Sequence, residues 1–175
     1  MPKIIENVRE KLIETTREQI KKYGYAGTTI RSVAKECSLG VGTVYNYFES
    51  KEKLVHAYMY KDWLTAKEQI LLCSERTDDP REILICIHTV LYEYMTEHRC
   101  LFADPHASKV FADYYVKGHV FLRNQLAEIL MEACNKHAKS PSELLPAFLA
   151  EEMLVWTAAG LPFENIYALQ KVHFK

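Results

Sequence analysis

Residues 28–54 read TTIRSVAKECSLGVGTVYNYFESKEKL, and this stretch decides the fold of the 175-residue chain. Its apolar residues recur at the spacing of two short helices, which we place at residues 28–36 and 41–47, with a turn between them. Either Thr28 or Thr29 can cap the first of these helices. Two short helices joined by a tight turn predict a helix-turn-helix, a motif that lays its second helix in the DNA major groove.

The remaining residues also favour helices. Long stretches carry apolar residues three or four positions apart, and the chain has only six Gly and six Pro. Both features predict an all-α protein. The further helices that we expect cover residues 4–23, a long segment after Ser50, a segment opening at Pro80, residues 109–136, residues 141–159 and a short segment near the end. The stretch near residues 99–107 is broken by Pro105.

Charge is unevenly distributed along the chain. Residues 1–55 carry 10 Lys and Arg against 7 Asp and Glu, whereas residues 56–175 carry 12 against 16. A basic N-terminal third suits a module that meets a polyanion, although an excess of this size also arises by chance.

Composition and motifs disfavour several other classes of protein. The five cysteines are odd in number and lack a C-x-x-C pair, which fits free thiols in a reducing cytoplasm. The N-terminus has no signal-peptide pattern, and no apolar run approaches the roughly 20 residues needed to cross a bilayer. Nucleophile motifs, phosphate loops and four-ligand metal spacings are not found in the sequence. We therefore expect a cytoplasmic protein that is not an enzyme, holds no metal or cofactor and does not enter a membrane.

One ordered pattern extends over about residues 9–54. It consists of Tyr23-Gly24 at a helix end, Thr29 with Val33-Ala34, the run Gly42-Thr43-Val44-Tyr45-Asn46-Tyr47-Phe48, then Lys51 and Leu54. In this order and spacing it resembles the DNA-binding domain of the TetR family of bacterial transcriptional regulators. The resemblance implies a three-helix helix-turn-helix domain at residues 1–50 and a helical ligand-binding and dimerisation domain at residues 51–175.

The residue types in this pattern indicate how DNA would be held. Hydroxyl groups at a helix start, a tyrosine hydroxyl and a lysine suit phosphate oxygens. The phosphate candidates are Thr28, Thr29, Tyr47 and Lys51. Side chains that can hydrogen-bond to base edges are Arg31, Thr43, Tyr45 and Asn46. Gly42 has no side chain and would let its helix approach the floor of the groove.

Some of these positions also have simpler explanations. Arg31 can be a solvated surface residue, Gly42 can be tolerated at a helix start, and Tyr45 can pack between the first and third helices. The turn departs from the family pattern, because Ser38 stands where glycine is usual. A left-handed Ser38 would cost roughly 1–2 kcal/mol.

Beyond Leu54 we find no motif, and residues 92–121 are rich in aromatic residues and histidines. An apolar pocket with a few polar groups is the usual form of a ligand site between helices. The ligand-binding candidates are Tyr92, Phe111, Tyr115 and His119, although residues of these types more often belong to an ordinary core.

The expected helix over residues 142–159 is apolar on more than one side. A four-helix dimer interface explains this pattern, and a buried central helix of a monomer is the alternative. Together with the resemblance, it predicts a homodimeric repressor that binds a palindromic operator in double-stranded DNA and is released by a small-molecule inducer. A helical ligand-binding protein that does not bind DNA is the alternative from another class.

Overall fold

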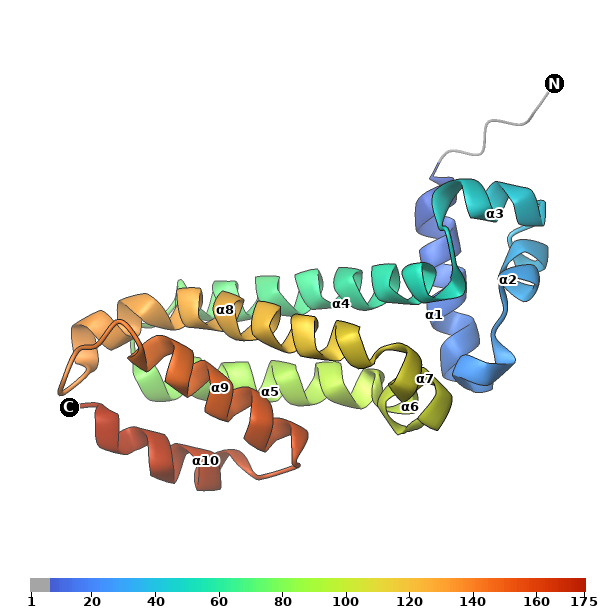
Figure 1. The fold of residues 1–175 in the computed structure, drawn as a ribbon. Coiled ribbons are helices and arrows are strands. Elements are labelled where there is room, and N and C mark those ends of the chain that lie inside the picture. Colours follow the sequence, from blue (N-terminus) through green and yellow to red (C-terminus); the bar gives the residue numbers. More distant parts are fainter. Residues whose placement is uncertain (1–6) are drawn as a thin grey trace. The chain divides into compact units, whose positions relative to one another are not determined.

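The computed structural model describes residues 7–175, while the side chains of residues 102, 106, 110 and 112–116 lie outside its described part. The described chain is built from helices, which confirms the all-α prediction (Figure 1). The helices run, in chain order, α1 Val8–Gly27, α2 Ile30–Glu36, α3 Val41–Tyr47, α4 Lys51–Ser74, α5 Pro80–Glu97, α6 Arg99–Ala103, α7 Pro105–Val110, α8 Ala112–His137, α9 Leu145–Ala158, α10 Phe163–Gln170 and the short 3-10 helix η1 Lys171–His173.

The helices form two compact units. The N-terminal unit is the described part of Met1–Trp63 together with His98–Ala112, and the C-terminal unit is Leu64–Glu97 together with Asp113–Lys175. Helix α4 contributes its first residues to one unit and its last residues to the other. The predicted division into a DNA-binding domain at residues 1–50 and a second domain at residues 51–175 stays a prediction.

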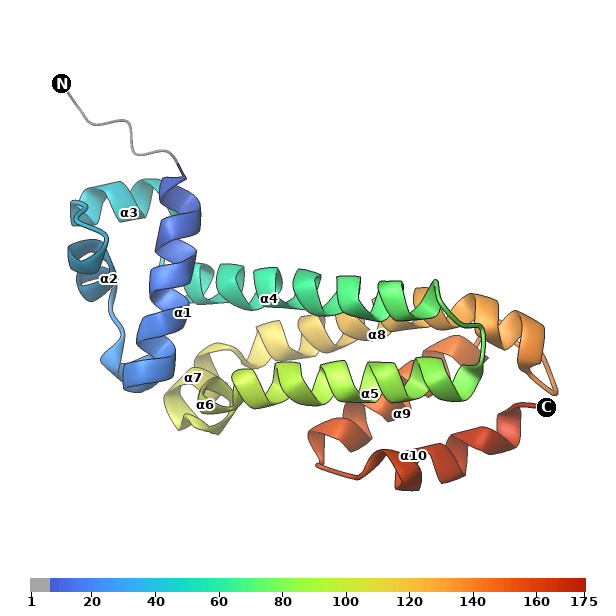
Figure 2. The ribbon, with the colours of Figure 1, turned by 180° about the vertical axis from the view of Figure 1, so that it is seen from behind.

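In the N-terminal unit, α1 packs against α2, and α2 packs against α3. Both views show α2 and α3 on the same side of α1 (Figures 1 and 2). The buried apolar side chains of this helix-turn-helix include Leu12, Ile20, Val33, Ala34, Val44, Phe48 and Leu54. Among the apolar residues of α3 and the position after it, Val44 and Phe48 are buried, whereas Val41 at the start of α3 is exposed.

The start of α2 follows the predicted chemistry. Thr29 is the N-cap, and its hydroxyl oxygen accepts a hydrogen bond from the Ser32 N–H at 3.0 Å. The Ser32 hydroxyl in turn donates to the Gln19 amide oxygen of α1 at 2.7 Å. The cap therefore both begins α2 and attaches it to α1.

The turn after α2 is built around the unusual serine. Ser38 has φ 58°, and the N–H groups of Ser38 and Leu39 donate to the carbonyls of Lys35 and Ala34. This pair of hydrogen bonds is the Schellman motif, in which the left-handed position is normally glycine. The Lys11 ammonium of α1 donates to the adjacent Cys37 carbonyl at 3.0 Å. The turn therefore adopts the geometry that is typical of glycine in spite of its serine.

The C-terminal unit contains the second part of α4 with α5, α8, α9 and α10, and α5 packs against both α9 and α10. Pro80 begins α5 after the Asp79 cap, as predicted. Helix α9 begins at Leu145 rather than at 141, because Ser142 instead accepts a turn hydrogen bond from the Leu144 N–H. No helix among the described residues is long and apolar enough to cross a membrane.

We expect Ser38→Gly to stabilise the N-terminal unit by about 1 kcal/mol, because glycine adopts the left-handed conformation without the steric cost that serine carries. Urea unfolding followed by circular dichroism measures the change. Ser38→Ala is the matched control and should give no gain. Equal stability of wild type and Ser38→Gly would show that the serine in this turn is not strained.

Candidate nucleic-acid interface

Helix α3 presents a polar face that no neighbouring helix covers. Tyr45 and Tyr47 are 53% and 47% exposed, and Asn46 between them is also exposed. On the opposite side Val44 is fully buried, and Phe48 follows it in the core. The small core therefore holds α3 by one face and leaves its hydrogen-bonding side chains at the surface.

The exposure of Tyr45 bears on one of the open alternatives. A side chain that is half exposed is not packed between α1 and α3, so its hydroxyl is available to a partner. Thr43, one turn from Tyr47, is half-buried.

Gly42 lies exposed at the start of α3, and a Cβ atom added there would meet no atom within 4 Å. The folded chain itself therefore gives no steric reason for glycine at this position. A close approach by a partner, such as the floor of a DNA groove, would give one.

The two candidate threonines before α2 have different surroundings. Thr29 is exposed at the helix start, where it can meet a phosphate. Thr28 is only 1% exposed, and its hydroxyl donates to the Gly24 carbonyl at 2.9 Å. Its side chain is therefore a structural part of the bend at Gly24, which corrects the expectation that it contacts phosphate. Arg31 in the first turn of α2 is exposed.

Lys51 at the start of α4 is directed into the N-terminal unit. Its ammonium donates to the Tyr25 carbonyl and lies 3.6 Å from the centre of the Tyr25 ring. Burial lowers the pKa of Lys51. The Tyr25 hydroxyl donates to Glu52 at 2.8 Å. Lys51 therefore joins the end of α1 to the start of α4, and a contact with phosphate would require it to leave this position.

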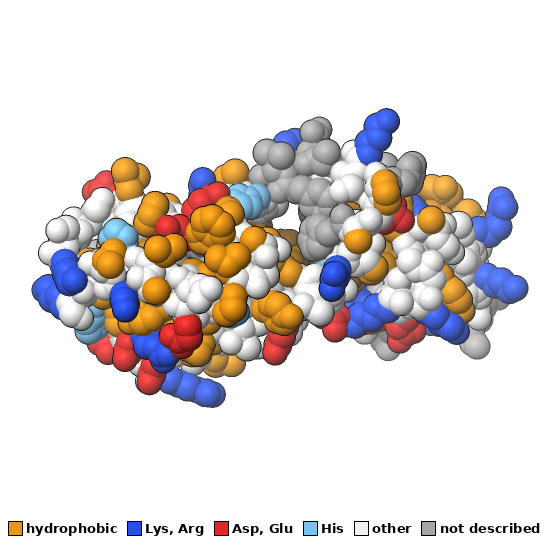
Figure 3. All heavy atoms as spheres, turned by 90° about the horizontal axis from the view of Figure 1, so that it is seen from below, with side chains coloured by type: hydrophobic (Ala, Val, Ile, Leu, Met, Phe, Trp, Pro, Cys, Tyr) orange, Lys and Arg blue, Asp and Glu red, His pale blue; other side chains and the backbone are white. Residues whose placement is uncertain are grey.

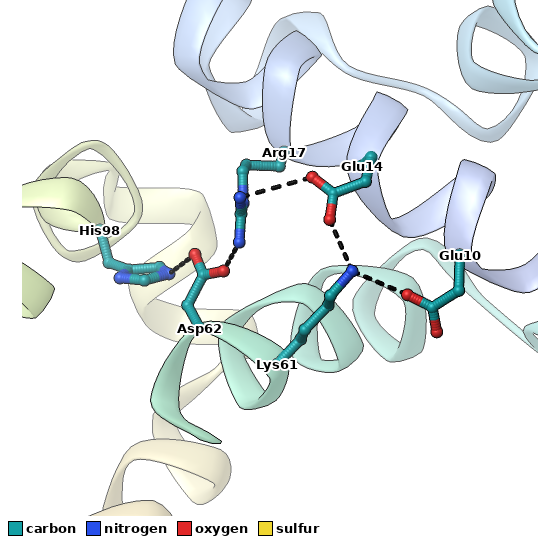
Figure 4. Close-up of polar contacts among 6 residues, drawn as sticks. All are labelled: Glu10, Glu14, Arg17, Lys61, Asp62 and His98. Carbon is teal, nitrogen blue, oxygen red and sulfur yellow. Dashed lines mark hydrogen bonds and ion pairs between the residues drawn. The ribbon is translucent and has the colours of Figure 1, made fainter. Parts of the chain in front are cut away.

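Charged side chains fasten α1 to α4. The Lys61 ammonium of α4 lies between Glu10 and Glu14 of α1, at 2.7 and 2.6 Å from their oxygens (Figure 4). The hydrogen bond from Lys61 lowers the pKa of Glu14, and the bonds to Glu10 and Glu14 raise the pKa of Lys61. Helix α1 packs against α2, and α2 packs against α3. These ion pairs therefore also hold the exposed polar face of α3, which we call the recognition face, relative to the first part of α4.

A second set of contacts between charged side chains is more buried than those of Lys61. Arg17 of α1 and His98, the residue before α6, approach the same carboxylate, that of Asp62 in α4 (Figure 4). The His98 Nε2 lies 3.2 Å from Asp62 Oδ2, and the His98 ring stacks on the Tyr58 ring with centroids 5.4 Å apart. Three helices of the N-terminal unit, α1, α4 and α6, thus meet at one acidic side chain.

The predicted ligand residues do not form one group in the described structure. Phe111 is buried in the N-terminal unit, where its ring packs edge-on against Tyr25 with centroids 5.6 Å apart, so we assign it to that core.

Tyr92 and His119 belong to the C-terminal unit. Tyr92 is exposed and stacks on His88, and His119 Nε2 lies 2.9 Å from Glu151. The side chain of Tyr115 lies outside the described residues.

Among the side chains that the structure describes, no three His, Cys, Asp or Glu side chains are grouped to hold a metal ion.

The helix-turn-helix lies in the part of the chain that is similar in sequence to known proteins. Residues 12–58 match the profile of the bacterial regulatory proteins of the tetR family. The HTH-type transcriptional regulator YuxN of Bacillus subtilis strain 168, itself described as uncharacterized, is 36% identical over 92 residues, which are 52% of this chain and 32% of YuxN. The chain spans less than half the length of the curated relatives that it matches first.

Two solved structures resemble the whole fold. The TetR family repressor AlkX from Dietzia sp. strain DQ12-45-1b aligns with a TM-score of 0.66 at 17% identity, over 93% of each chain. Thermus thermophilus FadR, a TetR family transcriptional repressor in complex with lauroyl-CoA, aligns with a TM-score of 0.61 at 19% identity, over 93% of this chain and 90% of that one. At these identities the comparison establishes the fold alone.

The contact between Lys61 and Glu14 makes the stability of the folded chain depend on pH. Because the folded pKa of Glu14 lies below its ordinary value of 4.5, its contribution to stability is present above that pH and is lost as pH falls through the folded pKa. We expect Glu14→Gln to lower stability at pH 7 by about 0.2–1 kcal/mol, as for an exposed pair. Denaturant unfolding of both proteins should show this difference shrink as pH falls below 4.5 and through the folded pKa of Glu14. Glu18→Gln, exposed on the same helix, is the control, and an unchanged difference at low pH would contradict the assignment.

Proposed function

We propose that the chain is a transcriptional regulator that binds double-stranded DNA, because residues 12–58 match the bacterial regulatory proteins of the tetR family. The observation that carries this proposal is the exposed face of α3. Tyr45, Asn46 and Tyr47 project from a short helix whose opposite side is buried. Side chains held in this way can enter a major groove without any change in the core.

Each exposed residue has a role that its chemistry suits. Asn46 can bond to adenine N6 and N7, and Thr43 and Tyr45 can bond to neighbouring base edges. Thr29 and Tyr47 are suited to phosphates through their hydroxyls, and Arg31 in the first turn of α2 can reach a base or a phosphate. Thr28 is excluded from this set by its burial.

The operator is proposed to be palindromic, because we infer that two chains associate through their C-terminal units. Most of the apolar stripe of α9, including Leu149 and Met153, is buried within the chain. What remains for a second copy is the exposed apolar side of α9, formed by Phe148, Val155 and Trp156. Figure 3 shows hydrophobic side chains at the surface of the C-terminal unit among charged ones. A two-fold dimer would present two copies of α3 to two half-sites.

Release from DNA is proposed to follow from ligand binding in the C-terminal unit. The structure of FadR, which shares the fold, contains lauroyl-CoA bound to the protein. We propose that this chain also binds a small molecule, which acts as its inducer. A ligand that favours one spacing of the two α3 helices shifts the population away from the DNA-binding form. Helix α4 contributes to both units and is the natural connection.

The alternative is a helical ligand-binding protein without DNA binding. Such a protein would have no use for an exposed polar face on α3 or for glycine at position 42. Gel retardation with DNA fragments from the region upstream of its own gene decides between the two. The regulator should retard a palindromic fragment, with affinity that falls steeply as salt rises, and failure to retard any fragment selectively would favour the alternative.

Gly42→Ala gives the most direct test of the recognition face. The added Cβ meets nothing in the free chain, so the variant should fold at least as stably as wild type. Against the floor of the groove the same methyl group should weaken operator binding by about tenfold or more, or about 1.4 kcal/mol.

The matched control is Gly118→Ala in α8, where an added Cβ also meets nothing. Thermal unfolding should show that both variants are folded, and fluorescence anisotropy with a labelled operator should show a loss for Gly42→Ala alone. Wild-type affinity in Gly42→Ala would remove α3 from the proposed groove contact.

The dimer surface is tested by Trp156→Glu. A charge at the centre of an apolar interface should shift the protein toward monomers at micromolar concentration, because the carboxylate would be buried without a partner. Sedimentation velocity measures the shift, and Leu72→Glu, at an exposed apolar position on α4, is the control. A wild-type dimer that is broken only by Leu72→Glu would place the interface elsewhere.

A further inference from the structure

A groove lies beside the recognition helix, within the N-terminal unit. Its volume is about 450 Å³. Its walls come from the start of α1, the end of α3 with the residues that follow it, and the first turns of α4. The lining residues are Arg9, Tyr47, Phe48, Glu49, Lys53, His56, Ala57 and Tyr60.

The polar lining of this groove is mainly basic. Arg9 from α1, Lys53 and His56 from α4 supply two cations and one titratable ring, against the single carboxylate of Glu49 among the lining residues. The Arg9 guanidinium lies 5.4 Å from the centre of the Phe48 ring, which holds it over the groove wall. A site of this charge favours an anion.

The groove is continuous with the proposed recognition face through one residue. Tyr47 lines the groove and also belongs to the exposed face of α3 beside Asn46. A DNA strand whose bases meet α3 has phosphates on either side of those bases, so the strand would pass the end of α3 where the groove opens. None of Arg9, Lys53 and His56 belongs to the sequence pattern that predicted DNA binding.

We propose that this groove binds a phosphodiester of the DNA backbone, with Arg9, Lys53 and His56 as the cationic partners and Tyr47 as a hydroxyl donor. The inference rests on the proposed DNA-binding function and adds to it a contact outside the helix-turn-helix. Because a phosphate contact carries no sequence information, it would strengthen binding to all sequences alike.

The imidazole of His56 makes this contact dependent on pH. In the free protein, burial and the neighbouring Lys53 lower the pKa of His56. The groups that share the groove with it are Arg9 of α1, Tyr47 and Glu49 at and after the end of α3, and Lys53 and Tyr60 of α4. A bound phosphate would favour the protonated ring and raise that pKa. DNA binding would then take up a proton, and affinity would rise as pH falls through the range of histidine titration.

The test compares how affinity depends on salt in charge-neutralising variants. Each of Arg9→Gln and Lys53→Gln should weaken binding to operator and non-operator duplexes alike and lower the salt slope by about one. Between 50 and 200 mM salt, each variant should then lose about 3.5-fold less affinity than wild type loses. Lys139→Gln in the C-terminal unit makes the same charge change and should bind as wild type, and Asn46→Ala should instead alter base preference.

A second measurement identifies the anion. The pKa of His56, followed by NMR of its ring protons, should rise when a short duplex is added and should rise much less with inorganic phosphate at equal ionic strength. An equal rise with inorganic phosphate would mark a free-anion site and overturn the assignment to DNA. Wild-type DNA binding with unchanged salt slopes in both variants would also overturn the groove contact while leaving the regulator intact. A wild type that binds no DNA would overturn both proposals.

Discussion

A largely buried carboxylate, that of Asp62, organises the N-terminal unit. It is approached by Arg17 from α1 and by His98 from the start of α6, and the His98 ring is almost fully buried against Tyr58. A charge removed from water costs several kcal/mol unless partners compensate it, so these three helices are constrained to meet at this point. The position of α1, and of everything packed on α1, depends on that constraint.

Helices α2 and α3 depend on this support because each has only seven residues. Isolated helices of that length are not stable in water, since nucleation is unfavourable and few hydrogen bonds follow it. The capping box of α2, the Schellman turn at Ser38 and the buried faces of Val33 and Val44 hold α2 against α1 and α3 against α2. A recognition face can therefore be polar and exposed without weakening the fold, because its stability comes from the other side of the same helices.

The local parts of this arrangement were predictable from the sequence. The Thr29 and Asp79 caps, the serine in the left-handed turn and the bounds of α3 all follow from signals within a few residues of each other. The structure assigns other roles where a side chain already has a partner inside the fold. Thr28 looked available to a phosphate but bonds back to Gly24, and Phe111 looked suited to a ligand but packs on Tyr25.

The sequence by itself determined that the chain is all-helical, that it carries a helix-turn-helix and which residues of α3 are polar, since periodicity, caps and turns are properties of neighbouring residues. Only the tertiary structure decided which polar groups are used inside the fold. It directed Lys51 to Tyr25, joined α1, α4 and α6 through Asp62, and brought Arg9 beside Lys53 and His56. These pairings join residues far apart in the chain, and such contacts depend on how helices pack rather than on the order of residues within any one of them.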